Sequence, residues 1–328
     1  MTAGAASYAG RPVLITGGTG FLGSNLVAAL RRQQAEVAIL GRSPLPEGGE
    51  LGSLLAGARH FQGDLRDGAL VGDAVAGRDV IFNLAGHSGS TNSNEEPLED
   101  LDVNLRGQLT LLESCRRLKT PPAVVFASSR LVYRPAESLP VAESAPTGPL
   151  SLYGVHKLAG ESYHLLYRHL YGLRSAVLRI TNPYGHFQKE GQNRYGIINW
   201  FIELAVAGRP LPVYGDGHQL RDYLHVDDVA RALLAAGSDP RADGQVFNVG
   251  SGAGVSFKRM AELVIREAGG GEVQHLSWPP DAARVETGDF VADVSRIKEV
   301  IGWTPLTPLD EGLRGVVEQY RRLRPRAG

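Results

Sequence analysis

The sequence predicts an α/β protein, in which a doubly wound parallel sheet is followed by a smaller C-terminal α/β domain. Three observations support this fold. Short β-branched runs alternate with segments of helical periodicity over the first half of the chain, as in sheets built from strand–helix–strand units. The alternation loosens after Asn182, where glycine and proline separate shorter elements. A length of 328 residues also exceeds what one small core needs.

The expected elements follow one another in chain order. Strands are expected at residues 12–16, 36–40, 79–84, 123–127 and 175–180, and helices at residues 21–32 and 153–171. Spacings of three and four predict one face of a further long helix, carried by Leu98, Leu101, Leu105, Leu109 and Leu112. A helix at 197–207, a strand at 211–214 and a helix at 257–267 form the smaller domain. This domain is expected at the carboxyl edge of the sheet, where ligands bind in such folds.

Composition narrows the possible functions. The chain has 34 Lys and Arg against 35 Asp and Glu, and the lack of a basic block argues against nucleic-acid binding. Cys115 is the single cysteine, so an internal disulfide and a thiolate metal cluster are excluded, and no metal site is expected. The first residues, MTAGAASYAGR, have no apolar core, so a signal peptide is not expected, and no run of about 18 apolar residues occurs in the sequence. We therefore expect a cytoplasmic protein without a membrane partner.

A glycine-rich turn joins the first expected strand to the first expected helix. Its sequence TGGTGFLG places Gly17, Gly20 and Gly23 at spacings of three, with Phe21 and Leu22 opening the helix. Glycines let the backbone approach a pyrophosphate closely, and the helix N-terminus offers free N–H groups. This turn in this context predicts dinucleotide binding. We accordingly expect a flexible tail over residues 1–10, a dinucleotide-binding domain over 11–181 and a substrate domain over 182–328, with one possible crossing back of the chain.

The residues after the second strand bear on the choice between NAD and NADP. An acid that binds the ribose hydroxyls is usual about 20 residues after the turn, whereas this chain has Gly41 and Arg42 there. An arginine favours a 2′-phosphate and hence NADP, although Arg42 stacking on adenine or facing solvent is an equal alternative. Asp64, in GDLRD, is expected to accept the adenine amino group or to cap the next helix.

A tyrosine and a lysine lie four residues apart in YGVHK. On a helix this spacing brings Tyr153 and Lys157 to the same face. A nearby ammonium, with a cationic nicotinamide close by, stabilises a phenolate, so Lys157 is expected to lower the pKa of Tyr153 and allow proton transfer at neutral pH. Ser128 and Ser129 lie at the end of an expected strand and complete a candidate catalytic group.

Taken together, TGGTGFLG, NLAG, SSRLVY, YGVHK, RITNPYG and RDYLHVDDVA resemble the extended short-chain dehydrogenase/reductase family. The resemblance covers residues 11–320 and is greatest to the NAD(P)-dependent nucleotide-sugar epimerases and dehydratases, which implies a Rossmann-like fold. Within the resemblance, Tyr153 transfers the sugar proton, Lys157 binds the nicotinamide ribose, and Ser129 holds the reacting oxygen. The resemblance also places Leu65, Leu84, Ala85 and Gly86 in the cofactor-binding site.

The resemblance also implies substrate contacts. Asn182 and Arg221 fall where the family contacts a nucleotide diphosphate, and Ser128 and Arg130 are further candidates. Of these two, Ser128 is expected to support the contacting residues more than to touch the substrate itself. Near the C-terminus the family often has an arginine where this chain has Glu286, so Arg284, two residues earlier, is expected to reach the phosphate instead or to remain a surface charge. His225 and Asp228 are expected to be structural: His225 packs, and Asp228 begins or caps a helix.

The resemblance leaves several reactions open. In the 4,6-dehydratases an Asp and a Glu at the serine loop eliminate water, and Arg130 and Leu131 replace them here. A glutamate at the position of Leu131 is also usual in UDP-glucuronate decarboxylases. We therefore expect a nucleotide-sugar epimerase that acts through a transient 4-keto intermediate, with an NADPH-dependent 4-ketoreductase as the alternative. A non-catalytic cofactor sensor is disfavoured because Tyr153 and Lys157 are both present.

The family resemblance further implies a homodimer. The helices expected at residues 98–117 and around Tyr153 would form its interface. Packing of their apolar faces on the sheet is the alternative, and it needs no partner.

Overall fold

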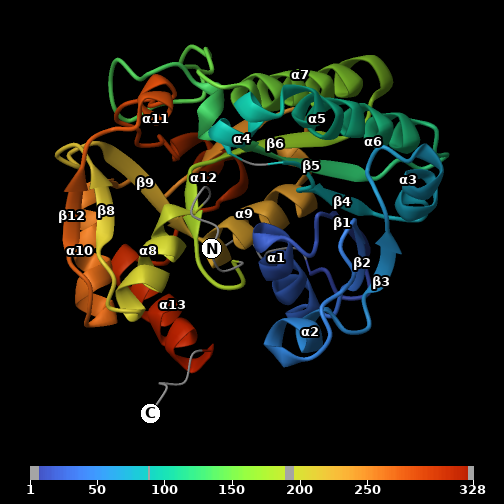
Figure 1. Cartoon of the computed structure of the whole chain (residues 1–328). Helices are drawn as coiled ribbons and strands as arrows, with labels where there is room; N and C mark the ends of the chain where they lie inside the picture. The colour runs from blue at the N-terminus through green and yellow to red at the C-terminus, as the bar shows by residue number, and fades with distance from the viewer. Residues whose placement is uncertain (1–6, 88, 189–195, 324–328) are drawn as a thin grey trace.

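A seven-stranded parallel sheet forms the centre of the protein in a computed structural model that describes residues 7–87, 89–188 and 196–323 (Figure 1). The strand order is β10-β6-β5-β4-β1-β2-β3, and every neighbouring pair runs parallel. The strands are β1 (Pro12–Thr16), β2 (Glu36–Gly41), β3 (Arg59–Gln62), β4 (Val80–Asn83), β5 (Ala123–Ser129), β6 (Ser175–Ile180) and β10 (Val246–Val249). The predicted doubly wound α/β fold is confirmed.

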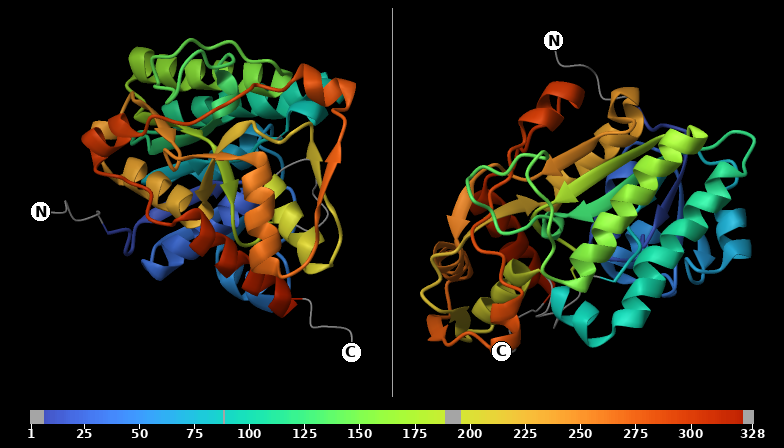
Figure 2. Two further views of the ribbon diagram at one scale, coloured as in Figure 1. Left: turned by 90° about the vertical axis from the view of Figure 1, so that its left-hand side faces the viewer. Right: turned by 90° about the horizontal axis from the view of Figure 1, so that it is seen from above.

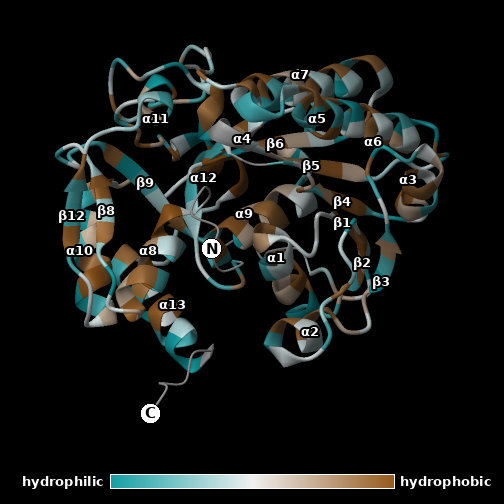
Figure 3. Cartoon of the chain, viewed as in Figure 1, coloured by the Kyte–Doolittle hydropathy of each residue, from teal (hydrophilic) through white to brown (hydrophobic). Residues whose placement is uncertain are grey.

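The interior strands are apolar along their length because helices cover both of their faces. In the register, Val13 of β1 lies between Val37 of β2 and Val80 of β4. Figure 3 shows β1, β4 and β5 as largely hydrophobic segments. This burial on both sides explains why these strands appear in the sequence as short continuous apolar runs.

Helices pack on the two faces of the sheet as separate layers. On one face, α3 (Gly68–Val75), α6 (Gly107–Arg116) and α7 (Leu152–Tyr171) lie side by side (Figure 2). Their buried residues, Val71, Leu111 and Cys115 among them, form one hydrophobic core with Leu14 of β1. On the other face, α1 (Phe21–Arg32) packs against α9 (Val226–Ser238). The nearby α2 (Gly49–Leu55) and α12 (Ser295–Ile301) complete this layer.

A smaller lobe follows the sheet in the chain and has a hydrophobic core of its own. It contains α8 (Ile197–Val206), α10 (Phe257–Ala268), α13 (Leu309–Leu323), the β8–β12 pair (Leu211–Tyr214 and Val273–Leu276) and the short helix α11 (Pro280–Arg284). Phe201, Met260 and Val316 are buried in this core. Three strands from separate parts of the chain form a further small sheet: β11 (Gly254–Ser256), β9 (Leu220–His225) and β7 (Asn182–Tyr184).

The chain returns to the first lobe after β9. Helix α9 packs beside α1, β10 extends the main sheet next to β6, and α12 contacts β10. A boundary at residue 182 therefore marks the start of the second lobe but does not separate the two lobes cleanly.

The N-terminal tail, expected over residues 1–10, is shorter in the structure because Tyr8 is already packed. Tyr8 is buried and its hydroxyl donates to the Leu234 carbonyl oxygen at 2.8 Å. Its ring also contacts Phe82 of β4. Residues 1–6 lie outside the described residues. Tyr8 therefore belongs to the packed domain, because an aromatic ring with a satisfied hydroxyl contributes to a core.

The leucine pattern predicted one regular helix face, and the structure keeps that face only in part. The segment consists of α5 (Pro97–Leu101), a π-helical turn η1 (Asp102–Arg106) and α6. Leu98 is 77% exposed and Leu101 is 42% exposed, whereas Leu112 is buried. Other buried residues lie off the pattern: Val103, Gly107, Leu111 and Cys115. A π-turn changes the helical phase, so spacings of three and four do not define one face across it.

The expected roles of His225 and Asp228 need correction in part. His225 is buried as predicted, but its side chain also caps α9 by accepting the Asp227 N–H. Asp228 lies inside the helix, where its carboxylate accepts the N–H groups of Leu306 and Thr307 and pairs with Arg231. Asp228 thus anchors a distant loop and does not cap the helix.

The described parts of the chain contain no helix with the length and apolarity needed to cross a bilayer.

Candidate functional site

The turn between β1 and α1 can be built only with glycine at two positions. Gly17 has a φ of 72°, which residues with a side chain rarely adopt. A Cβ on Gly23 would lie 2.2 Å from the Gly17 carbonyl oxygen. Gly20 is the N-cap of α1 and provides no side-chain hydrogen bond, and the first turn has no acidic residue. The first N–H groups of α1 are therefore open to an anion, and this cradle fits a dinucleotide pyrophosphate.

A cavity of about 820 Å³ begins at this turn and continues over the carboxyl ends of the strands. All of the predicted cofactor residues line it: Gly17, Gly20, Phe21, Leu22, Gly23, Arg42, Asp64, Leu65, Leu84, Ala85, Gly86, Tyr153 and Lys157. It reaches Asn182, Arg221 and Glu286 at its other end. One continuous space therefore joins the candidate dinucleotide site to the candidate substrate site.

Arg42 and Asp64 lie at the dinucleotide end and have different partners. The Arg42 side chain is 57% exposed, with Nη1 at 4.0 Å from a Glu99 carboxylate oxygen and Nη2 at 3.1 Å from Nε2 of His87. Asp64 accepts two hydrogen bonds from the Arg66 guanidinium, and these bonds lower the pKa of its carboxyl. Helix α3 is capped by Asp67, so the capping alternative for Asp64 is wrong.

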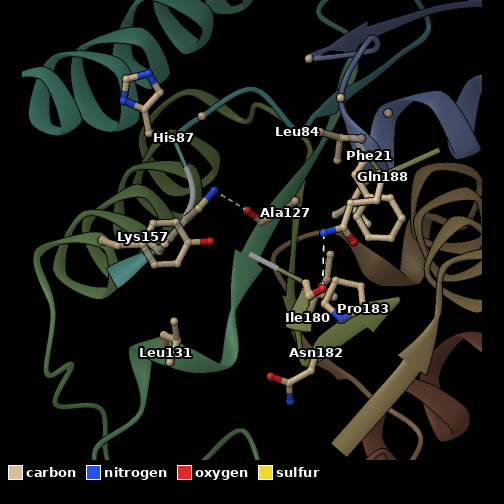
Figure 4. A pocket seen from close by; sticks show the side chains of 18 of the residues that line it. Phe21, Leu84, His87, Ala127, Leu131, Lys157, Ile180, Asn182, Pro183 and Gln188 are labelled. Atoms are coloured by element: carbon tan, nitrogen blue, oxygen red, sulfur yellow. Dashed lines mark hydrogen bonds between the residues drawn. The ribbon is translucent and has the colours of Figure 1, made fainter. Parts of the chain in front are cut away.

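Tyr153 and Lys157 lie on one face of α7 and border the cavity, as their spacing predicts. The Lys157 ammonium donates to the Ala127 carbonyl oxygen at 2.9 Å (Figure 4) and lies 5.7 Å from the centre of the Tyr153 ring. Burial lowers the pKa of Lys157 to about 8, and the negative charges of Asp100 and Glu161 oppose this effect. Lys157 thus remains largely protonated near pH 7.

Burial is the main influence on the pKa of Tyr153. It raises this pKa to about 12, while the Ser129 hydroxyl favours the phenolate. The cost of burying a phenolate exceeds the effect of the polar neighbours that the protein itself provides, and the lowering expected with the cationic nicotinamide beside Lys157 stays a prediction.

A buried polar network beside this pair was not found from the sequence. Asn104 on η1 accepts the His87 N–H at 3.0 Å and donates to the His87 carbonyl oxygen at 3.1 Å. It also donates to Asp100 at 3.0 Å, and the other oxygen of Asp100 lies 2.5 Å from Nδ1 of His156. His156 immediately precedes Lys157, so the network connects His87, which lines the cavity, to the helix of the catalytic pair. In the structure a π-helical turn marks the network, since such turns are frequent at functional sites, but no sequence pattern does.

The two serines of β5 have different surroundings. Ser128 is buried and donates to Glu161 at 2.5 Å, and Glu161 pairs with Arg179 of β6 at 2.7 Å. Ser128 also lines the cavity, but its hydroxyl supports α7 through Glu161, which agrees with a role behind the residues that would touch a substrate. The Ser129 hydroxyl accepts the Leu131 N–H at 3.2 Å and lies close enough to Tyr153 to favour its phenolate and so lower its pKa. Ser129 is therefore the serine that acts on the candidate proton-transfer residue.

Two arginines lie at the far end of the cavity: Arg221 lines it, and Arg130 lies behind Asn182, which lines it. Arg221 on β9 is buried and pairs with Glu286, while its Nη1 donates to the Gly288 carbonyl oxygen at 2.7 Å. Arg130 donates from Nε to the Asn182 side-chain oxygen at 3.3 Å and from Nη1 to the Thr287 hydroxyl at 2.9 Å. Figure 4 shows Asn182 and Leu131 at this end, away from His87.

Arg284 does not take part in the site. Its side chain is 79% exposed and contacts Asp281 at 3.5 Å within α11. The alternative of a surface charge is therefore correct, and Arg284 does not replace the arginine that the family often has at the position of Glu286. Residues two apart share a face only on a strand, and this segment is a short helix followed by a turn.

Aromatic side chains form part of the same end of the cavity. Tyr214 and Trp278 face each other with ring centres 5.4 Å apart, and Phe257 and Tyr223 line the cavity nearby. They come from four separate elements, so no local sequence pattern marks them. Such rings offer faces on which a planar base can stack.

Comparison with known proteins identifies relatives over nearly the whole chain. Residues 13–250 match the NAD dependent epimerase/dehydratase family. A UDP-glucose 4-epimerase of Mycolicibacterium smegmatis is 32% identical and is aligned over 94% of this chain and 98% of its own. A dTDP-glucose 4,6-dehydratase of Streptomyces niveus is 30% identical, over 94% of this chain and 92% of its own.

Two solved structures have closely similar folds. The UDP-glucose 4-epimerase of Thermotoga maritima with UDP-glucose has a TM-score of 0.87 at 29% identity and covers 95% of this chain and 99% of its own. The UDP-glucose 4-epimerase of Thermus thermophilus in complex with NAD has a TM-score of 0.84 at 32% identity, with the same coverage of 95% and 99%.

Proposed function

The chain belongs to the NAD-dependent epimerase/dehydratase family, and we propose that it is a nucleotide-sugar epimerase that acts through a transient 4-keto sugar. One observation carries the proposal: Tyr153, Lys157, Asn182 and Arg221 border a single cavity that starts at the glycine turn. Similarity to proteins that contain UDP-glucose and NAD supports the same ligand classes here.

The proposed chemistry assigns distinct roles to three side chains. A dinucleotide held at the glycine turn by Gly17, Gly20 and Gly23 would supply reversible hydride transfer, with the return to the opposite face of the 4-keto sugar. Tyr153 removes the proton from the hydroxyl group of the reacting sugar carbon and gives it back to the epimeric oxygen. Ser129 holds the reacting oxygen beside Tyr153, and the charged Lys157 favours the phenolate that forms transiently. Tyr153 is therefore the proposed acid and base of both half-reactions.

The distribution of carboxylates disfavours dehydration. Among the described residues that line the cavity, the only acids are Asp64, at the dinucleotide end, and Glu286, which pairs with Arg221. Arg130 and Leu131 follow Ser129 directly, and neither can act as the acid or base that elimination of water needs. The serine loop thus supports hydride and proton transfer without a further acid–base pair.

Arg42 supports the 4-ketoreductase as the second candidate. It is half-exposed and lines the dinucleotide end of the cavity, where a guanidinium can bind a 2′-phosphate. A reductase consumes NADPH and releases NADP, whereas an epimerase retains its cofactor. The family relationship supports NAD, and the preference between NAD and NADP remains a prediction.

Incubation with UDP-, dTDP-, GDP- and CDP-sugars, each with and without NADPH, tests the proposal. Formation of a sugar isomer without net cofactor consumption is expected. Stoichiometric loss of NADPH with a 4-keto sugar would favour the reductase instead. Tyr153→Phe should lower turnover by at least about 100-fold, which is the usual contribution of a general acid–base group, and should leave dinucleotide binding intact. Unchanged turnover in this variant would exclude Tyr153 as the catalytic group.

We also propose a homodimer formed through α5 and α7. Leu98 and Leu101 of α5 and Val155, Leu166 and Leu170 of α7 are exposed. The sheet therefore does not account for these apolar residues, and a second copy would cover them. A cytoplasmic location and the assignment of the second lobe to the nucleotide sugar stay predictions.

A further inference from the structure

Two arginines from different elements hold one short loop, which we call the 286–288 loop. Arg221 of β9 pairs with the Glu286 carboxylate and donates to the Gly288 carbonyl oxygen. Arg130, which follows β5, donates to the Thr287 hydroxyl at 2.9 Å. All three residues of the loop thus receive a hydrogen bond from a guanidinium at the substrate end of the cavity.

Arg130 forms no direct ion pair at this place. Among the described residues, Glu286 is the one carboxylate paired with Arg221, and Arg130 has no carboxylate within salt-bridge distance. The Asp222 carboxylate is buried close by and accepts from Ser251 and from the N–H groups of Gly252 and Ala292. Burial and the neighbouring charge of Arg221 lower the pKa of Arg130 to about 10, and the charges of Glu286 and Asp222 oppose this effect. A partly buried cation without a direct ion pair is a place where an anionic ligand can bind.

The loop has few other attachments to the protein. None of the residues of α11, which precedes it, is buried. Gly288 has a φ of 69° with nothing near its Cβ position. Within the loop, the Glu286 carboxylate also accepts the Gly288 N–H at 2.9 Å, and contacts with other elements resume at Asp289 and Phe290, which bond to the backbone of Leu220. The Glu286 carboxylate can therefore leave Arg221 by rotation of its own side chain, which breaks this one local hydrogen bond, or by movement of an exposed segment.

We propose that Glu286 is an internal counter-ion that occupies the anion position of the substrate's diphosphate, which displaces it from Arg221. Arg130 then serves as the second cation of the diphosphate site, in place of an arginine on the 280–289 segment. The inference rests on the proposed function because it concerns the same site. It adds a competition between Glu286 and the diphosphate for Arg221. The carboxylate of Glu286 lowers the affinity for the diphosphate, and removal of this negative charge would raise that affinity.

Binding of a base-free probe tests this inference separately from the proposed function. Calorimetric titration with inorganic pyrophosphate, in saturating NAD so that the glycine turn is filled, reports on the two arginines alone. UDP and the uncharged nucleoside uridine are titrated in parallel. We compare the wild type with Glu286→Gln, Arg130→Gln and Asp281→Asn. The last variant removes an exposed charge from the same segment without touching either arginine.

The Glu286→Gln variant is expected to bind pyrophosphate and UDP about 10-fold more tightly, and Arg130→Gln about 10- to 100-fold more weakly, as for the gain or loss of a charge-assisted hydrogen bond. Uridine binding should not change, and Asp281→Asn should resemble the wild type. Equal or weaker pyrophosphate binding by a folded Glu286→Gln protein would overturn the inference, as would a similar gain in Asp281→Asn. If pyrophosphate responds as expected while no nucleotide sugar is converted, the proposed function fails and the anion site stands.

Discussion

Replacing Gly23 by alanine is the sharpest test of the glycine turn. The added Cβ would lie 2.2 Å from the Gly17 carbonyl oxygen and 2.6 Å from the Gly18 Cα. Non-bonded carbon atoms prefer separations of about 3.5–4.0 Å, so the turn must move by about 1 Å. Both clashing atoms belong to the backbone, which cannot rotate away as a flexible side chain can.

Two opposing effects determine the stability of this variant. Alanine in place of glycine favours a helix by about 1 kcal/mol, whereas overpacking a tight site costs about 1–3 kcal/mol. The free energy of unfolding should therefore fall by up to about 2 kcal/mol. Movement of the turn also displaces the N–H groups that face the pyrophosphate, so NAD should bind at least about 10-fold more weakly.

Gly72→Ala provides the matched control. Gly72 lies inside α3, and nothing lies within 4 Å of its Cβ position, so this variant should gain about 0.5–1 kcal/mol and bind NAD normally. Urea unfolding and fluorescence titration with NAD measure both quantities. A Gly23→Ala protein as stable as Gly72→Ala, with the dissociation constant of the wild type, would refute the steric reasoning.

Three further predictions concern the catalytic pair, the cofactor and the assembly. Asp100→Asn removes a negative charge that opposes the effect of burial, so the pKa of Lys157 should fall below about 8. The alkaline limb of the kcat/KM profile should then move to lower pH, and a limb that stays in place would contradict this role of Asp100. Arg42→Asp should weaken NADP binding at least about 10-fold more than NAD binding, and an equal loss for both in titrations would argue against a 2′-phosphate contact. Leu170 is 55% exposed on α7, so Leu170→Glu should shift a dimer toward monomer in light scattering, whereas an unchanged mass would place any interface elsewhere.

Features that depend on residues close together in the chain could be predicted from the sequence. The limits of β1, α1, β6 and β8 agree with the apolar runs and helical spacings. The four-residue spacing of Tyr153 and Lys157 does bring both to the cavity. Local sterics and periodicity determine these features, so distant partners hardly change them.

The leucine pattern shows where this reasoning fails. Leu98 and Leu101 belong to a regular spacing, yet they face away from the core. The π-helical turn that offsets them is stabilised by contacts of Asn104 with Asp100 and with the His87 backbone. The spacing of hydrophobic residues alone cannot distinguish a face that packs on the sheet from one that a partner covers.

By itself, the sequence determined the α/β class, the glycine turn and the tyrosine–lysine pair. The tertiary structure alone decided that β10 pairs with β6, that Arg130 reaches Thr287 across 157 positions, and that Glu286 meets Arg221. The first group follows from steric preferences within a few residues. The second depends on which distant segments the folded chain brings together, and charges such as those of Arg130 and Glu286 acquire a role only from the neighbours they meet there.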